Sequence, residues 1–111
     1  IRDRYDDSII FGSTKETIRE AVEEAVSKSA NLKSANLKSA NLKSANLESA
    51  DLEFANLKFA NLKFANLESA NLESANLESA NLKFAKTEFC IIQFSKKEIE
   101  QAKQFVKGLE L

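Results

Sequence analysis

A strict five-residue pattern of apolar and polar positions runs through the middle of the chain. An alanine and, two positions later, a leucine recur at every fifth residue, first as Ala30 and Leu32 and last as Ala80 and Leu82. Asparagine, replaced once by Asp51, stands between them. On an α-helix a five-residue step rotates the side chain by roughly 140°, and on a flat strand it alternates between faces. Neither straight element therefore buries every leucine.

Within one repeat, the spacing predicts a short extended side followed by a corner. Residues two apart on extended backbone share a face, so Ala and Leu point inward and Asn points outward. Stacked coils of this kind hydrogen-bond edge to edge, as strands do, at about 4.8 Å per layer. This reasoning leaves the number of sides per coil open. The alternative is a disordered low-complexity tract, and the strict register of Leu and Ala argues against it.

The repeat units SANLK, SADLE and FANLK resemble the pentapeptide-repeat family, whose motif is A(D/N)LXX. Eleven consecutive units within residues 29–83 fit this motif in register. The resemblance implies a mainly β fold, a right-handed quadrilateral β-helix with about 20 residues per coil. For this chain it implies a solenoid of about three coils at residues 29–94.

The ends of the chain do not repeat and predict caps for the solenoid, which a short solenoid requires. In residues 1–28, the run Ser8–Phe11 predicts a strand, paired in a hairpin with an arm at Arg4 and Tyr5. A capping-box pattern at Ser13 predicts a helix over Thr14–Ser27. This leader resembles that of pentapeptide-repeat proteins from bacterial and phage genomes. A second capping box predicts a C-terminal capping helix at residues 95–111.

Composition and charge exclude several classes of function. The net charge is −1, and residues 29–88 hold seven lysines and seven acidic residues, so we expect no nucleic acid and no membrane as partners. The chain contains no His, and Cys90 is its only cysteine. We therefore expect no disulfide, a reducing cytoplasmic location, no metal and no cofactor. Cys90 takes an inward alanine position as a small hydrophobic residue.

The same shortage of reactive groups argues against an enzyme. Without His no nucleophile–base pair can be assembled around Cys90. Gly12 and Gly108 are the only glycines, so there is no glycine-rich phosphate loop. We expect no catalytic residues, no cofactor-binding residues and no small-molecule substrate.

The variable outward positions remain as the candidate interaction surface. If residues twenty apart stack, one column holds lysines only and the next glutamates only, and Phe64 stacks directly on Phe84. Phe54, Phe59 and Phe64 occupy the corner position of three successive units and form a girdle, which is either a structural cover of the strand edges or a contact surface. The candidate residues are Phe54, Phe59, Phe64, Lys43, Lys63, Lys83, Glu48, Glu68 and Glu88.

Two functions follow from these observations. The first is a non-enzymatic structural or protein-interaction module, a rigid solenoid whose girdle contacts another protein or a second copy. The second rests on the family resemblance alone: a DNA-mimic modulator of a type II topoisomerase such as gyrase. The short rod and the neutral repeat region disfavour the second, because mimicry of a polyanion needs an anionic surface. The regularity of the repeats is compatible with a natural array or an engineered, consensus-like one.

Overall fold

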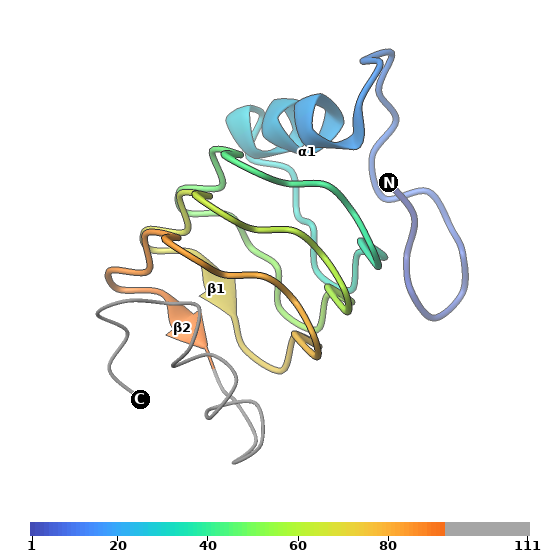
Figure 1. Ribbon diagram of the computed structural model, residues 1–111. Helices are drawn as coiled ribbons and strands as arrows, with labels where there is room; N and C mark the ends of the chain where they lie inside the picture. Colours follow the sequence, from blue (N-terminus) through green and yellow to red (C-terminus); the bar gives the residue numbers. More distant parts are fainter. Residues whose placement is uncertain (93–111) are drawn as a thin grey trace.

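The computed structural model describes residues 1–92. Its regular elements are one helix, α1 (Ile18–Ser27), and two short strands, β1 (Asn71–Leu72) and β2 (Ile91–Ile92). The two strands pair in parallel, with Asn71 opposite Ile91 and Leu72 opposite Ile92. Between α1 and β2 the chain winds through stacked layers (Figure 1). The predicted C-terminal helix at residues 95–111 and the last repeat residues, 93 and 94, lie outside the described residues.

Neighbouring layers pair at a spacing of twenty residues. Parallel bridges join Asn36 to Asn56, Asn41 to Asn61, and Asn46 to Asn66, and the series continues to the bridge between Asn66 and Lys86. Twenty residues are four five-residue units, so each layer contains four short sides and four corners. The sides are brief because the chain turns after every Ala-Asn-Leu segment, which explains why only two segments form named strands.

In the units of residues 55–69, every backbone N–H group has an acceptor, as buried polar groups require. In the unit 60–64, the Asn61 N–H donates to the preceding layer, and the Leu62 and Phe64 N–H groups donate to the following layer. The Ala60 N–H closes the turn of its own layer, and the Lys63 N–H donates to the Asn61 side chain. The donor–acceptor distances are 2.9 Å (Asn61 N to Ala40 O), 2.7 Å (Leu62 N to Asn81 O), 3.0 Å (Phe64 N to Lys83 O) and 2.9 Å (Ala60 N to Leu57 O), and 3.0 Å (Lys63 N to Asn61 Oδ1).

The corners are tight turns with left-handed backbone at the last residue of each unit. The N–H of Ala65 donates to the carbonyl of Leu62 at 3.0 Å, and Phe64, just before it, has φ 62°. A four-residue turn with positive φ at its third residue is a type II turn. The corner serines and phenylalanines from Ser29 to Phe89 all share this geometry, with φ between 55° and 64°. This region normally favours glycine or asparagine.

The alanines and leucines fill the interior, as their spacing predicted. All leucines from Leu32 to Leu72 are at most 1% exposed, and Leu77 and Leu82 are 4% and 3% exposed. No polar side chain is buried among the described residues. The asparagines stay outside the core. From Asn31 to Asn81 each accepts a hydrogen bond from the backbone N–H two residues later, and Asp51 does the same.

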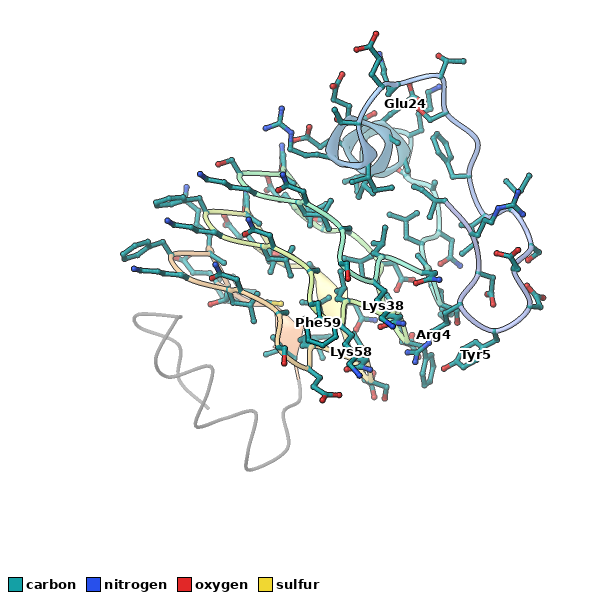
Figure 2. All side chains as sticks on the ribbon, turned by 45° about the vertical axis from the view of Figure 1, so that its right-hand side comes forward. Arg4, Tyr5, Glu24, Lys38, Lys58 and Phe59 are labelled. Carbon is teal, nitrogen blue, oxygen red and sulfur yellow. The ribbon has the colours of Figure 1, made fainter. Side chains whose placement is uncertain are left out.

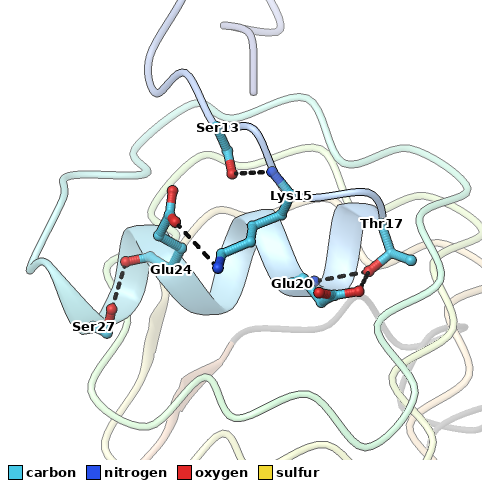
Figure 3. Close-up of polar contacts among 6 residues, drawn as sticks. All are labelled: Ser13, Lys15, Thr17, Glu20, Glu24 and Ser27. Carbon is cyan, nitrogen blue, oxygen red and sulfur yellow. Dashed lines mark hydrogen bonds and ion pairs between the residues drawn. The ribbon is translucent and has the colours of Figure 1, made fainter.

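The helix start predicted at Thr14 was wrong, because another capping box, formed by Thr17 and Glu20, lies four residues after the one at Ser13. The α1 helix begins at Ile18, and Thr17 is its N-cap. The Thr17 hydroxyl accepts from the Glu20 N–H at 3.1 Å and donates to the Glu20 carboxylate at 3.0 Å (Figure 3). The Ser13 hydroxyl instead accepts from the Lys15 N–H at 3.1 Å. The later start places Val22, which is fully buried, in the core cluster.

The N-terminal segment pairs with itself and with the first layer. An antiparallel bridge joins Arg2 to Ile9, and a second joins Asp3 to Ala35. The arm that faces the run Ser8–Phe11 is therefore Ile1–Asp3. The prediction that Arg4 and Tyr5 form this arm was wrong, since both lie in the turn. None of the helices in the part of the chain described here is long and apolar enough to cross a membrane.

Candidate functional site

The stacking places the candidate charged residues in two straight columns. Each layer has four corners, which we name the lysine corner (Lys43, Lys63, Lys83), the glutamate corner (Glu48, Glu68, Glu88), the Lys33 corner (Lys33, Glu53, Glu73) and the Lys38 corner (Lys38, Lys58, Glu78). In the lysine corner, the N–H of Ser44 donates to the carbonyl of Lys63 at 2.8 Å. In the glutamate corner, the N–H of Ser69 donates to the carbonyl of Glu88 at 2.8 Å. Successive charges in a column are thus held one layer apart by the backbone.

The three candidate phenylalanines lie on three different corners. Phe54 belongs to the Lys33 corner, Phe59 to the Lys38 corner and Phe64 to the lysine corner, and they are 40%, 52% and 50% exposed. Rings on separate corners of one layer do not gather into a cluster. Stacking between layers does bring two rings together: Phe64 and Phe84 lie 5.3 Å apart between centroids with an interplanar angle of 18°. The prediction that these two rings stack is confirmed.

Each exposed ring on the lysine and Lys38 corners carries an ammonium group over its face. The Nζ atoms lie 5.2 Å from the ring centroid for Lys58 over Phe59, 5.4 Å for Lys63 over Phe64 and 5.1 Å for Lys83 over Phe84. Figure 2 shows Lys38 and Lys58 on neighbouring layers, with Phe59 beside Lys58. Cation–π contacts at exposed sites contribute about 0.5–1 kcal/mol each. They hold the lysine side chains beside the rings.

Phe54 has a different environment, next to the N-terminal segment. Arg4 donates from Nη1 to the Phe54 carbonyl at 3.1 Å, and its guanidinium lies 5.0 Å from the centroid of the Tyr5 ring. Arg4 and Tyr5 extend from the N-terminal turn (Figure 2). Phe54 is therefore separated from the lysine–phenylalanine pairs of the other two corners.

The layers separate the charges onto opposite faces, which the neutral sum of the repeat region conceals. The side formed by residues 40–42, 60–62 and 80–82 lies between the lysine and Lys38 corners, so it is flanked by five lysines and one glutamate. We call it the basic face. The side formed by residues 50–52, 70–72 and 90–92 lies between the glutamate and Lys33 corners. It carries six carboxylates, Asp51 included, against Lys33 and the Arg4 guanidinium, which donates to the Phe54 carbonyl at that corner. We call it the acidic face.

The two faces are opposite because they are two units apart in a layer of four. Ion pairs between layers neutralise part of each face. Lys58 Nζ lies 3.7 Å from the Glu78 carboxylate, and Lys33 Nζ lies 3.4 Å from the Glu53 carboxylate. Alignment of residues twenty apart predicted the lysine column and the glutamate column from the sequence. The two faces become apparent only when each column is combined with the neighbouring corner that bounds the same side of the layer.

The described residues offer no reactive centre. No three His, Cys, Asp or Glu side chains in residues 1–92 are placed to hold a metal ion. Burial raises the pKa of the Cys90 thiol to about 11, so the thiol is neutral at ordinary pH. Hollows at the surface lie beside α1, and one is lined by Ile18, Arg19, Asn41 and Lys43. Arg19 there is engaged by Glu23 at 3.7 Å.

Comparisons with known proteins detect the same five-residue repeat. A family model described as Pentapeptide repeats matches residues 28–58 and 55–86, in eight copies. Together these ranges span just over half of the 111 residues. A search of curated proteins finds no match.

Several solved structures are similar to this chain. One is the pentapeptide repeat protein Rfr23 from the cyanobacterium Cyanothece 51142, with 41% identity over 52% of this chain and 44% of that chain, and a TM-score of 0.35. Another is HetL, a pentapeptide repeat protein involved in heterocyst differentiation regulation in Nostoc sp. strain PCC 7120, with 33% identity over 52% of this chain and 34% of that chain, and a TM-score of 0.28. The chain thus spans less than half the length of these two proteins.

Proposed function

The chain belongs to the pentapeptide repeat family, whose members form right-handed quadrilateral β-helices, and on that premise we propose that it is a non-enzymatic protein-interaction module. Its contact surface is the basic face with the rings at its two edges. The observation that supports this most directly is the set of three lysine–phenylalanine pairs on adjacent corners, at Phe59, Phe64 and Phe84.

A rigid solenoid suits this role because its outward side chains have fixed positions. We infer a β-helix of about three coils that is closed by caps at residues 1–28 and 95–111. For the first cap, the support is hydrogen bonding at the edge of the first layer, which would otherwise present unpaired N–H groups to another chain. The Asn36 N–H donates to the Arg2 carbonyl at 2.7 Å, and the Asn46 N–H donates to the Glu23 carboxylate at 2.8 Å.

The exposed rings are suited to a protein partner. Phe59, Phe64 and Phe84 are each about half exposed, at 52%, 50% and 47%. Aromatic side chains are enriched at protein interfaces, and a surface patch with an excess of one charge favours a partner of the opposite charge. We therefore expect the partner to present carboxylates around an apolar centre. Neither the fold of residues 1–92 nor the comparisons favour a modulator of a type II topoisomerase over a general protein-interaction module.

Photo-crosslinking in cells of the source organism tests the proposed function. A photoreactive residue is introduced at Asn61, in the middle of the basic face, and the crosslinked proteins are compared with those of the triple variant Phe59→Ser, Phe64→Ser, Phe84→Ser. Phe54→Ser is the matched control, because it removes an exposed ring outside the face. We expect a defined set of proteins with the wild-type face and with Phe54→Ser, and its loss in the triple variant. Identical crosslinks in all three proteins would refute the proposed contact surface.

A further inference from the structure

We propose that the basic face of one copy docks on the acidic face of a second copy, so that the solenoids associate side by side with parallel axes. This inference rests on the proposed function, in that it takes the basic face as a contact surface, and it names the chain itself as one partner. The acidic face carries an excess of the opposite charge, with six carboxylates against Lys33 and Arg4.

The two faces match in spacing because both are made by the same layers. Charges in the lysine corner and in the glutamate corner repeat every twenty residues, which corresponds to about 4.8 Å between layers. A copy translated perpendicular to its basic face brings its glutamate corner opposite the lysine corner of the first copy, because both corners bound the same side of the layer. The pairs that meet in register are Lys43 with Glu48, Lys63 with Glu68, and Lys83 with Glu88.

The same translation also pairs aromatic rings. The Lys38 corner meets the Lys33 corner of the neighbour, so Lys58 faces Glu53, and Phe59 faces Phe54 together with the Arg4 side chain that lies at the same corner. In the lowest described layer, Phe84 faces Phe89, which is 83% exposed. Two like-charged pairs also meet, Lys38 with Lys33 and Glu78 with Glu73. Lys33 and Glu78 already have partners within their own copy, Glu53 at 3.4 Å and Lys58 at 3.7 Å, so their repulsion is reduced.

The geometry makes the association open-ended. Each copy uses one face to dock and presents the opposite face to the next copy, and head-to-tail contacts of this kind do not close unless a rotation accompanies them. Exposed ion pairs are individually weak and are screened by salt. We therefore expect low affinity, strong dependence on ionic strength, and growth in mass beyond a dimer as concentration rises.

Sedimentation velocity and light scattering of the purified full chain test this inference. We expect the average mass to rise with concentration in about 20 mM NaCl and to return to the monomer in about 0.5 M NaCl, where the Debye length falls to roughly 4 Å. The double variant Lys63→Glu, Lys83→Glu should be monomeric in low salt, and so should Glu68→Lys, Glu88→Lys. An equimolar mixture of these two variants should associate again, because the reversed corners complement each other. The control Lys15→Glu, Lys86→Glu changes the net charge by the same amount as Lys63→Glu, Lys83→Glu, at positions outside both faces, and should associate more like the wild type than either face variant does.

The association and crosslinking experiments distinguish failure of the self-association proposal from failure of the proposed function. A monomer at every concentration in low salt would overturn self-association and leave the proposed contact with other proteins standing. Association that persists in about 0.5 M NaCl, or a mixture of the two variants that stays monomeric, would overturn the face-to-face arrangement. If the purified chain associates as expected and no other protein crosslinks, the general interaction function fails and this inference holds. Circular dichroism of each variant verifies that the fold is kept.

Discussion

The left-handed backbone at the corners predicts a gain in stability on substitution by glycine, even though no side-chain contact is made or lost. Ser69 lies at a corner with φ 60°, and its backbone N–H donates to the Glu88 carbonyl at 2.8 Å. The side chain is exposed. Replacing Ser69 with glycine removes no hydrogen bond of the backbone and opens no cavity. Its main effect is on the backbone conformation itself.

The expected gain follows from two opposing free energies. Holding a non-glycine residue in the left-handed region costs about 1–2 kcal/mol. Glycine escapes that cost and loses about 0.4–1 kcal/mol through the greater freedom of the unfolded chain. The net stabilisation of Ser69→Gly then lies between about 0 and 1.6 kcal/mol. The middle of this range, about 0.8 kcal/mol, corresponds to a rise in Tm of about 3–6 °C for a domain of this size.

Thermal and urea unfolding, followed by circular dichroism, measure the change. Glu68→Gly is the matched control, because Glu68 precedes the corner and its φ is not positive; there glycine should lower stability by about 0.5–1 kcal/mol. Ser69→Val should also lower it, since a β-branched residue fits the left-handed region poorly. The reasoning is refuted if Ser69→Gly destabilises the protein as much as Glu68→Gly does.

Three further predictions concern the core, the corner hydrogen bond and the thiol. Leu62 is fully buried, so Leu62→Ala should cost about 3–5 kcal/mol in urea unfolding, and a loss below about 1 kcal/mol would contradict a close-packed interior. Asn61→Ala removes the acceptor of the Lys63 N–H at 3.0 Å and should cost about 0.5–1.5 kcal/mol; Asn61→Asp should cost less, because Asp51 accepts the equivalent bond at 3.2 Å, and equal losses would count against this role. Because burial raises the pKa of the Cys90 thiol to about 11, its alkylation at pH 8 should be roughly two orders of magnitude slower than that of a free thiol. The alkylation rate should keep rising with pH beyond 9, whereas a plateau near pH 9 would show that the thiol is not buried.

The five-residue period was sufficient to predict which side chains fill the interior and, with twenty residues per coil, which outward side chains stack in columns. Alanine and leucine two residues apart must share a face on extended backbone, so the buried leucines and the Phe64–Phe84 stack followed once residues twenty apart were aligned. The four sides per layer came from the family resemblance and not from the residues. The observed bridge of Asn36 with Asn56, and its equivalents, supply that spacing independently.

Other features were not accessible from sequence patterns for physical reasons. Two capping boxes lie four residues apart, and local hydrogen bonding permits either as a helix start. Docking of Val22 on the core accompanies the start at Ile18. The left-handed corners were missed because serine and phenylalanine are not residues that signal positive φ; the two inward residues and the interlayer hydrogen bonds impose that conformation on them.

The stacking spacing has a consequence for how such an array changes in evolution. Insertion or deletion of twenty residues adds or removes a whole layer and leaves every later side chain on its original corner. Loss of a single five-residue unit keeps the Leu interior intact, yet it moves every later residue to the neighbouring corner. In this chain, deletion of the unit 55–59 would move Lys63 to the position now held by Lys58, Lys83 to that of Glu78, and Glu68 to that of Lys63. The fold tolerates changes in steps of five, whereas the pattern of its faces is inherited only in steps of twenty.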